Sequence, residues 1–169
     1  MLDSPSPYNI IFKEGLYYFT TSQGRSYTCV FTEVNRFLPP LFTVHDIEVY
    51  MFDFFFNAPH PQIKKHKDDR ISVTIKSLLS DFFRSNRVLI YICDSSDGKG
   101  MYRNKVFKNW FKSVEDRYRC NHIEIDVFDL EPIYGAVIRS NEFQQEELLE
   151  RDVIQQIDRI VMEKFGLGQ

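Results

Sequence analysis

The side chains best suited to chemistry cluster in one segment, from Cys93 to Lys105, where an apolar run breaks into a polar loop and then a lysine-rich helix. The start of a helix carries unpaired backbone N–H groups and a partial positive charge, so such a segment can face a phosphate or a carboxylate. A carboxylate of the loop could then hold a metal ion or accept a proton. The sequence therefore offers one candidate ligand or anion site, formed by Asp94, Asp97, Lys99, Arg103 and Lys105.

The same loop also has the composition of an ordinary chain reversal. Ser95, Ser96 and Asp97 are common turn and helix-cap residues, and Gly98 and Gly100 ease a tight bend. The glycine and lysine spacing of a phosphate-binding P-loop is absent. A turn without a ligand is therefore the alternative to the anion site.

No nucleophile of the chain has the sequence neighbours that are typical of catalysis. The GxSxG turn that exposes a reactive serine in many hydrolases does not occur. Cys93 ends an apolar run, where a cysteine is expected to pack as a small hydrophobic residue rather than to react as a thiolate. Catalytic residues therefore stay unassigned, and the sequence favours a protein that is not an enzyme.

A second candidate is a basic face on the helix that follows the loop. Lys105, Lys108 and Lys112 recur at helical spacing, opposite the apolar stripe that contains Trp110. Such a face could contact the phosphates of nucleic acid or an acidic partner. With 21 basic and 24 acidic residues the chain has a formal charge of −3, so nucleic acid is the less favoured partner. The alternative is a helix face that is simply solvated.

Metal ions and cofactors are not expected. The connection from His60 to Asp69 contains two histidines and two aspartates, His60, His66, Asp68 and Asp69. Interleaved lysines would repel a cation, and no helical pair of ligands is present. The three cysteines are far apart and have neither CxxC nor Cys/His spacing, which argues against a disulfide framework and a structural zinc site.

Hydrophobic periodicity predicts the elements that must position these residues. Because Tyr50 to Phe56 is almost continuously aromatic, its strand is expected to be central and covered on both faces. The predicted elements are strands at Tyr8–Lys13, Leu16–Thr21, Arg25–Phe31 and Val44–Phe56, a helix from Asp68 or Asp69 to Phe83, a strand at Arg87–Cys93, a helix over Met101–Tyr118, strands within Ile123–Phe128 and Ile133–Ile138, and a helix from Asn141.

This order, βββ-β-α-β-α-β-β-α, predicts an α+β (mixed α/β) fold in which an antiparallel meander extends into a mixed sheet packed by about three helices. A single domain is expected over residues 1–169, with 1–7 as a loose N-terminal segment. No apolar run approaches the roughly 20 residues that span a bilayer, and no signal peptide is visible. We therefore expect no membrane contact and a cytoplasmic location.

Three stretches, YYFTTSQGRSYTCVF, DDRISVTI and YICDSSDGKGMYRNKVFKNWF, resemble a family of small uncharacterised bacterial proteins that consist of a standalone domain of unknown function. The stretches lie between Tyr8 and Phe111, so the resemblance covers nearly the whole chain. It implies an architecture and a bacterial context, but no activity. It also implies the signature positions Asp69, Arg70, Thr74, Asp94, Asp97, Arg103, Phe107 and Trp110.

One pairing is expected from the order of the elements. Arg70 begins a helix, and Asp94 and Asp97 follow the next strand, so these groups could meet at one edge of the sheet. Asp69 and Arg70 are therefore a candidate structural polar clamp, with half of a polar site as the alternative.

The function that the sequence favours is a non-catalytic binding or regulatory module, acting through a protein partner or as a homodimer. An aromatic-rich sheet that leaves an apolar patch would serve that role. The alternative is an enzyme or ligand-binding protein for a phosphorylated small molecule or nucleic acid, which would use residues 93–105.

Overall fold

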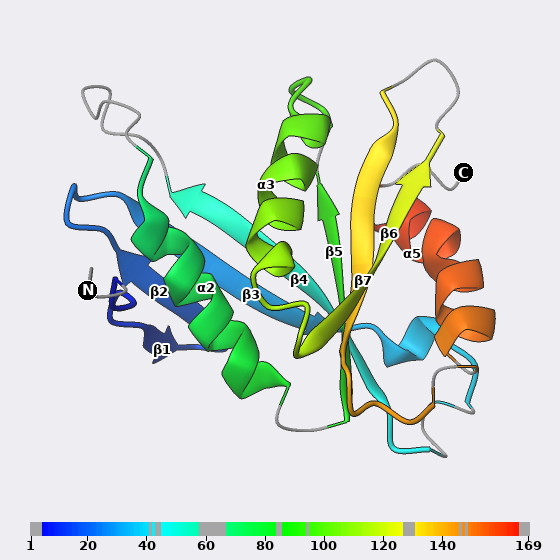
Figure 1. Cartoon of the computed structure of the whole chain (residues 1–169). Coiled ribbons are helices and arrows are strands. Elements are labelled where there is room, and N and C mark those ends of the chain that lie inside the picture. The colour runs from blue at the N-terminus through cyan, green and yellow to red at the C-terminus, as the bar shows by residue number, and fades with distance from the viewer. Residues whose placement is uncertain are drawn as a thin grey trace.

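The protein is built around a seven-stranded mixed sheet with helices on both faces (Figure 1). The computed structural model describes residues 5–40, 42, 45–57, 67–83, 86–93, 95–126, 131–145, 147 and 149–165. Its elements are β1 (Ile11–Lys13), β2 (Leu16–Thr20), β3 (Ser26–Glu33), the 3₁₀ helix η1 (Asn35–Phe37), β4 (Glu48–Asn57), α2 (Asp69–Phe82), β5 (Arg87–Cys93), α3 (Gly100–Lys112), β6 (Tyr118–Ile125), β7 (Ile133–Ser140), the π-helix η2 (Leu149–Ile154) and α5 (Gln155–Phe165). The predicted α+β class and element order are confirmed.

The strands lie in the order β1-β2-β3-β4-β5-β7-β6, and their pairing is antiparallel except at β4 and β5. These two strands run parallel, with Val49 opposite Val88 and Phe52 opposite Tyr91. The pairing of β4 with β5 ends at Phe52 and Tyr91. From there β4 continues to Asn57 without β5, while β5 remains paired with β7. The hairpin β6–β7 therefore completes the sheet on the far side of β5.

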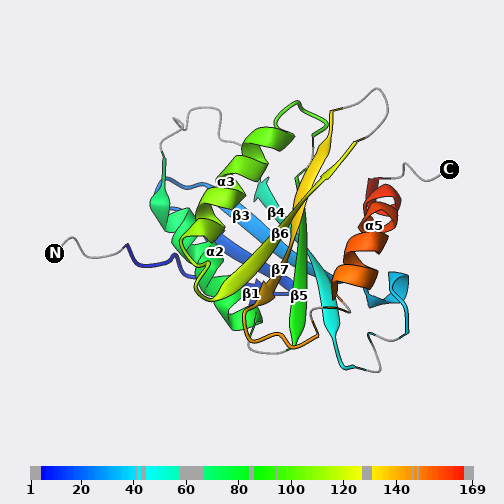
Figure 2. The same ribbon diagram turned by 45° about the vertical axis from the view of Figure 1, so that its right-hand side comes forward.

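Two hydrophobic cores form, one on each face of the sheet. Leu89 and Tyr91 point into the core under α2 and α3, whereas Val88 and Ile90 point into the core under η2 and α5. Figure 2 shows α5 on the opposite side of the sheet from α2 and α3. The continuous apolar sequence of β5 follows from this burial on both faces.

Several predicted boundaries are wrong because distant contacts compete with local pattern. The first strand begins at Ile11 and not at Tyr8, and α3 ends at Lys112, so that Tyr118 opens β6 instead of ending the helix. No helix begins at Asn141, whose side chain donates to the backbone oxygen of Asp116 at 2.8 Å. Residues 44, 127, 128, 146 and 148, which the predicted elements include, lie outside the described residues.

Tyr50–Phe56 belongs to a central strand, as predicted, but the expectation that this stretch is covered on both faces fails at its end. Met51 and Phe52 are buried on opposite faces, but Phe55 and Phe56 at the end of the strand are exposed. Coverage stops there because β5 has already left β4. Among the described residues, no helix is long and apolar enough to cross a membrane.

Candidate functional site

Asp97 and Arg103, two residues of the predicted anion site, bind each other. Arg103 donates from Nη1 to Asp97 Oδ1 at 2.6 Å and from Nη2 to Oδ2 at 2.7 Å, while the Lys99 N–H donates to Oδ1 at 3.1 Å. The hydrogen bonds and charge of Arg103 lower the pKa of Asp97 from 3.8 to about 2. The pair therefore joins the loop to the first turns of α3. Asp94 lies outside the described residues.

Gly100 has no side chain, and this allows Ser95 of the same loop to pack directly against it. A Cβ on Gly100 would lie 2.9 Å from the Cβ of Ser95, which is too close for two side chains to coexist. The Ser95 hydroxyl donates to the backbone oxygen of Pro132 at 3.0 Å, and the Gly98 N–H donates to the Ser95 oxygen at 3.0 Å. Gly98 has φ 69°, a conformation that suits glycine. These contacts describe a closed turn packed on the start of β7.

Arg70 holds the N-terminal segment and does not pair with Asp97, which is bound to Arg103. Its Nε donates to the backbone oxygen of Ser6 at 2.9 Å, and its guanidinium carbon lies 3.9 Å from the centroid of the Tyr8 ring. The expected meeting of Arg70 with Asp97 is therefore wrong, because the aspartate has a nearer partner six residues along its own chain.

Two hydrogen bonds hold Tyr8 against the start of α2, one from its backbone and one from its side chain. Its N–H donates to Thr74 Oγ1 at 2.8 Å, and its hydroxyl donates to Asp68 Oδ2 at 2.8 Å. Asp69 forms an exposed ion pair with Lys67 at 3.0 Å. The polar groups at the start of α2 thus bind protein atoms, and they anchor Tyr8, which directly follows the segment 1–7 that is predicted to be loose.

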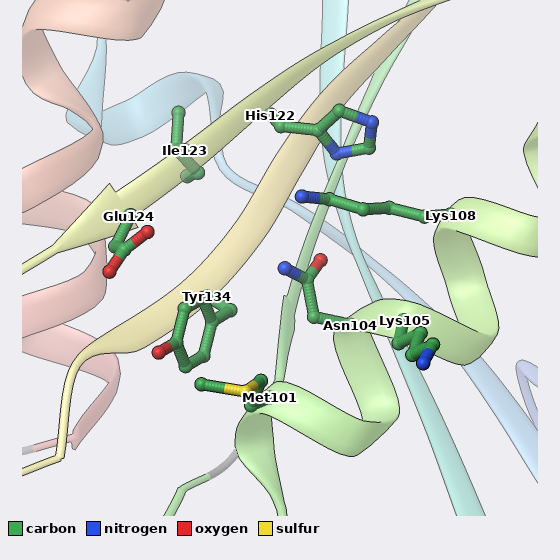
Figure 3. Close-up of a pocket in the computed structure, with 8 residues that line it drawn as sticks. All are labelled: Met101, Asn104, Lys105, Lys108, His122, Ile123, Glu124 and Tyr134. Carbon is green, nitrogen blue, oxygen red and sulfur yellow. The ribbon is translucent and has the colours of Figure 1, made fainter.

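A pocket of about 340 Å³ lies between α3 and the β6–β7 hairpin. Lys105 and Lys108 of the predicted basic face are among the residues that line it, whereas Lys112 is not. Figure 3 shows helix side chains facing strand side chains across this space. The lining residues are Met101, Asn104, Lys105, Lys108, His122, Ile123, Glu124 and Tyr134.

Asn104 is the buried polar group of this pocket. It is 5% exposed, and its Oδ1 accepts a hydrogen bond from the hydroxyl of Tyr91 at 3.2 Å. Burial raises the pKa of Tyr91, so the hydroxyl stays protonated and keeps the amide oxygen turned toward it. The amide nitrogen consequently faces the pocket near Lys108 (Figure 3), where no described residue accepts its hydrogen bond.

Opposite charges lie at the two ends of the pocket. Burial and the nearby charge of Lys108 lower the pKa of His122. Burial, with Glu124 as the leading charge, raises the pKa of Tyr134. The potential is therefore positive beside His122 and negative beside Tyr134. Among the described residues, no ion pair joins Glu124 to a lysine.

The cysteines near the pocket are poor nucleophiles. Burial raises the pKa of Cys93 and of Cys120 to about 12, so both are thiols at neutral pH. Cys120 Sγ lies 3.8 Å from His122 Nδ1, but the ring does not overcome the cost of burying a thiolate. The described part of the chain contains no group of three or more histidine, cysteine, aspartate or glutamate side chains placed to hold a metal ion.

Sequence reasoning named Lys105 and Lys108 but missed the residues opposite them. One signal was available: Asn104 is a polar residue on the helix stripe that also carries Phe107 and Phe111. The alternation of His122 and Glu124 on one face of a strand was another. Neither signal shows which helix faces which strand.

The fold and this site define a mixed α+β domain in which one helix and a β-hairpin flank a small, open surface pocket. The model of a family of unknown function, DUF6169, matches residues 67–152, which is more than half of the 169-residue chain, and the protein belongs to this family. The expected domain of unknown function is thereby confirmed. The match includes every residue that lines the pocket. A search of curated proteins gives no match.

Proposed function

We propose that the protein is a non-catalytic binding module that holds a small anionic ligand, a phosphorylated or carboxylated metabolite, between α3 and the β6–β7 hairpin. The observation that carries this proposal is the buried amide of Asn104, which Tyr91 orients into the pocket beside Lys108. An anionic oxygen would accept from this amide while it pairs with the lysine.

The charges and the size of the pocket support a small anion. Lys105 and Lys108 both line it, and no ion pair to a described residue neutralises either one. Hydrogen bonds to charged groups contribute about 1.5–3 kcal/mol each. At about 340 Å³ the space is at the lower end for small-molecule sites, which suits a metabolite better than a nucleic-acid strand.

Titration with inorganic phosphate, followed by amide chemical shifts in NMR, tests the proposal. We expect saturable shifts in residues 101–108, 122–124 and 134. We also expect about ten-fold weaker binding in Lys108→Gln, because one charge-assisted hydrogen bond is lost. The double variant Tyr91→Phe/Asn104→Leu should weaken binding similarly, since it removes both hydrogen-bonding partners without leaving one of them unpaired. Arg103→Gln should bind as the wild type does, because Arg103 does not line the pocket.

Lys112→Gln is the matched control, since it makes the same charge change on the same helix outside the pocket. Equal weakening in Lys108→Gln and Lys112→Gln would contradict a pocket site and point to the helix face as a whole. The absence of any saturable shift would overturn the proposal.

A second candidate function, binding of a second copy of the chain, is supported by one surface. Ile11, Tyr18, Thr28 and Phe55 stand opposite one another across four strands, on the face of the sheet away from α2. Ile11 is 57% and Phe55 is 52% exposed at the two ends of this row, whereas Thr28 is only 8% exposed, and exposed apolar side chains favour association. Sedimentation velocity over a range of concentrations tests this candidate. A dimer that disappears in Phe55→Asp supports it, and a monomer at every concentration contradicts it.

A further inference from the structure

We infer that the ligand of this pocket is a small zwitterion, in which a carboxylate or phosphate at one end is joined by a short carbon chain to an ammonium group at the other. This inference rests on the proposed function and extends it. The anion site uses only Lys105, Lys108 and Asn104, and the opposite end of the same pocket carries Glu124.

The two ends of the pocket present groups of opposite kind. Asn104 and Lys108 reach into the pocket from α3, and both are hydrogen-bond donors (Figure 3). Glu124 comes from β6 on the other side, away from Lys108, and next to Tyr134. Among the described residues, the structure pairs the carboxylate of Glu124 with no cation. An ammonium group of the ligand would be its partner.

The pKa shifts of the residues beside each end agree with a positive end at Lys108 and a negative end at Glu124. Burial is the largest cause of both shifts; beyond it, the charge of Lys108 lowers the pKa of His122, and the charge of Glu124 raises the pKa of Tyr134. A simple anion would gain from the first end and be repelled by the second. A molecule with charges of both signs gains from both.

Part of the pocket lining is apolar. In Figure 3 the buried ring of Tyr134 and the exposed side chain of Met101 lie next to each other, on the same side of Asn104 as Glu124. Such a surface suits methylene groups, which lose contact with water on binding. The ligand class is therefore an amino acid with separated charges, or an amine-bearing phosphate ester, and the two share an anion, a short carbon linker and an ammonium.

Matched pairs of probes test this inference by NMR titration at pH 7 and constant ionic strength. The zwitterions β-alanine, 4-aminobutyrate and 5-aminopentanoate are compared with propionate, butyrate and pentanoate, and phosphoethanolamine with ethyl phosphate. We expect the best zwitterion to bind about two- to five-fold more tightly than its deaminated partner, the range for a partly exposed ion pair. The preferred linker length reports the separation of the two ends.

Glu124→Gln should abolish this preference and leave the deaminated anion bound at least as tightly as in the wild type, because a repulsive charge has been removed. Glu115→Gln, an exposed glutamate outside the pocket, is the control and should keep the preference. Lys108→Gln should weaken both members of each pair.

The experiment distinguishes failure of the zwitterion inference from failure of the proposed anion site. If phosphate and the deaminated anions bind at the pocket but the amine adds nothing and Glu124→Gln changes nothing, the zwitterion inference is overturned and the anion site stands. If neither member of any pair binds, the proposed function itself fails.

Discussion

The hydroxyl of Tyr91 determines which way the amide of Asn104 faces. Tyr91 belongs to β5 in the middle of the sheet, and Asn104 lies on α3, yet their side chains share a buried hydrogen bond of 3.2 Å. Because a protonated phenol donates here, the amide oxygen turns inward and the nitrogen turns toward the pocket. A residue of the sheet core thus orients a donor at the surface.

Removing that hydroxyl should weaken both the fold and the site. Tyr91→Phe leaves the Asn104 oxygen buried without its donor, so we expect the free energy of unfolding to fall by about 1–3 kcal/mol. Urea denaturation followed by the fluorescence of Trp110 measures the change. Tyr18→Phe, on the open face of the sheet, is the control and should change stability by less than about 0.5 kcal/mol. Equal stability of Tyr91→Phe and wild type would mean that the hydrogen bond contributes nothing.

Asp97 should titrate well below an ordinary aspartate. Its pKa in the folded protein is about 2 against a usual 3.8, so its pair with Arg103 stabilises the folded state above about pH 4 and is lost as the pH falls toward 2. A carbon-13 NMR titration of the carboxyl group measures this pKa directly. In Arg103→Gln the pKa should rise toward 3.8. An Asp97 pKa near 3.8 in the wild type would show that the pair does not form in solution.

Gly100→Ala should destabilise the protein although alanine is the better helix former. The new methyl group meets the Cβ of Ser95, and moving Ser95 breaks its bond to Pro132. We expect a loss of about 1–3 kcal/mol in thermal or urea denaturation, as for other overpacked sites. Ser95→Gly/Gly100→Ala removes the overlap and should recover part of that loss. If Gly100→Ala were more stable than the wild type, the loop would be shown to accommodate the new methyl group without strain.

Thr74→Val should release the N-terminal segment. Valine has nearly the same shape but no acceptor, so the buried N–H of Tyr8 loses its partner at a cost of about 1–3 kcal/mol. Hydrogen exchange at the Tyr8 amide should accelerate, while exchange in the middle of β5 changes less. Ser77→Ala, at an exposed position of α2, is the control. Unchanged exchange at Tyr8 would contradict the anchoring role of α2.

The three cysteines should react slowly with a thiol reagent in the folded protein. Burial raises the pKa of Cys29, Cys93 and Cys120 to about 12, so little thiolate is present at pH 8. We expect the modification rate with dithionitrobenzoate to rise by orders of magnitude in denaturant. Rapid labelling of Cys120 in the native state would instead indicate that His122 activates it.

The local elements of this fold were largely predictable. The strand at Arg87–Cys93 has the bounds that its apolar run predicts, and α2 begins where Asp68 can cap it, since that carboxylate accepts from the Arg70 N–H at 3.1 Å. Burial periodicity and helix capping depend on neighbours within a few residues. A single sequence therefore contains the information for them.

The order of the strands and the partners of the polar residues were decided only by the tertiary structure. Asn141 has the residue type of a helix cap, but the start of β6 at Tyr118 brings the preceding turn against it, and its amide binds Asp116. The insertion of β7 between β5 and β6 likewise places Glu124 and His122 opposite α3. These contacts join segments far apart in the chain, and hydrophobic periodicity specifies which face is buried but not what buries it.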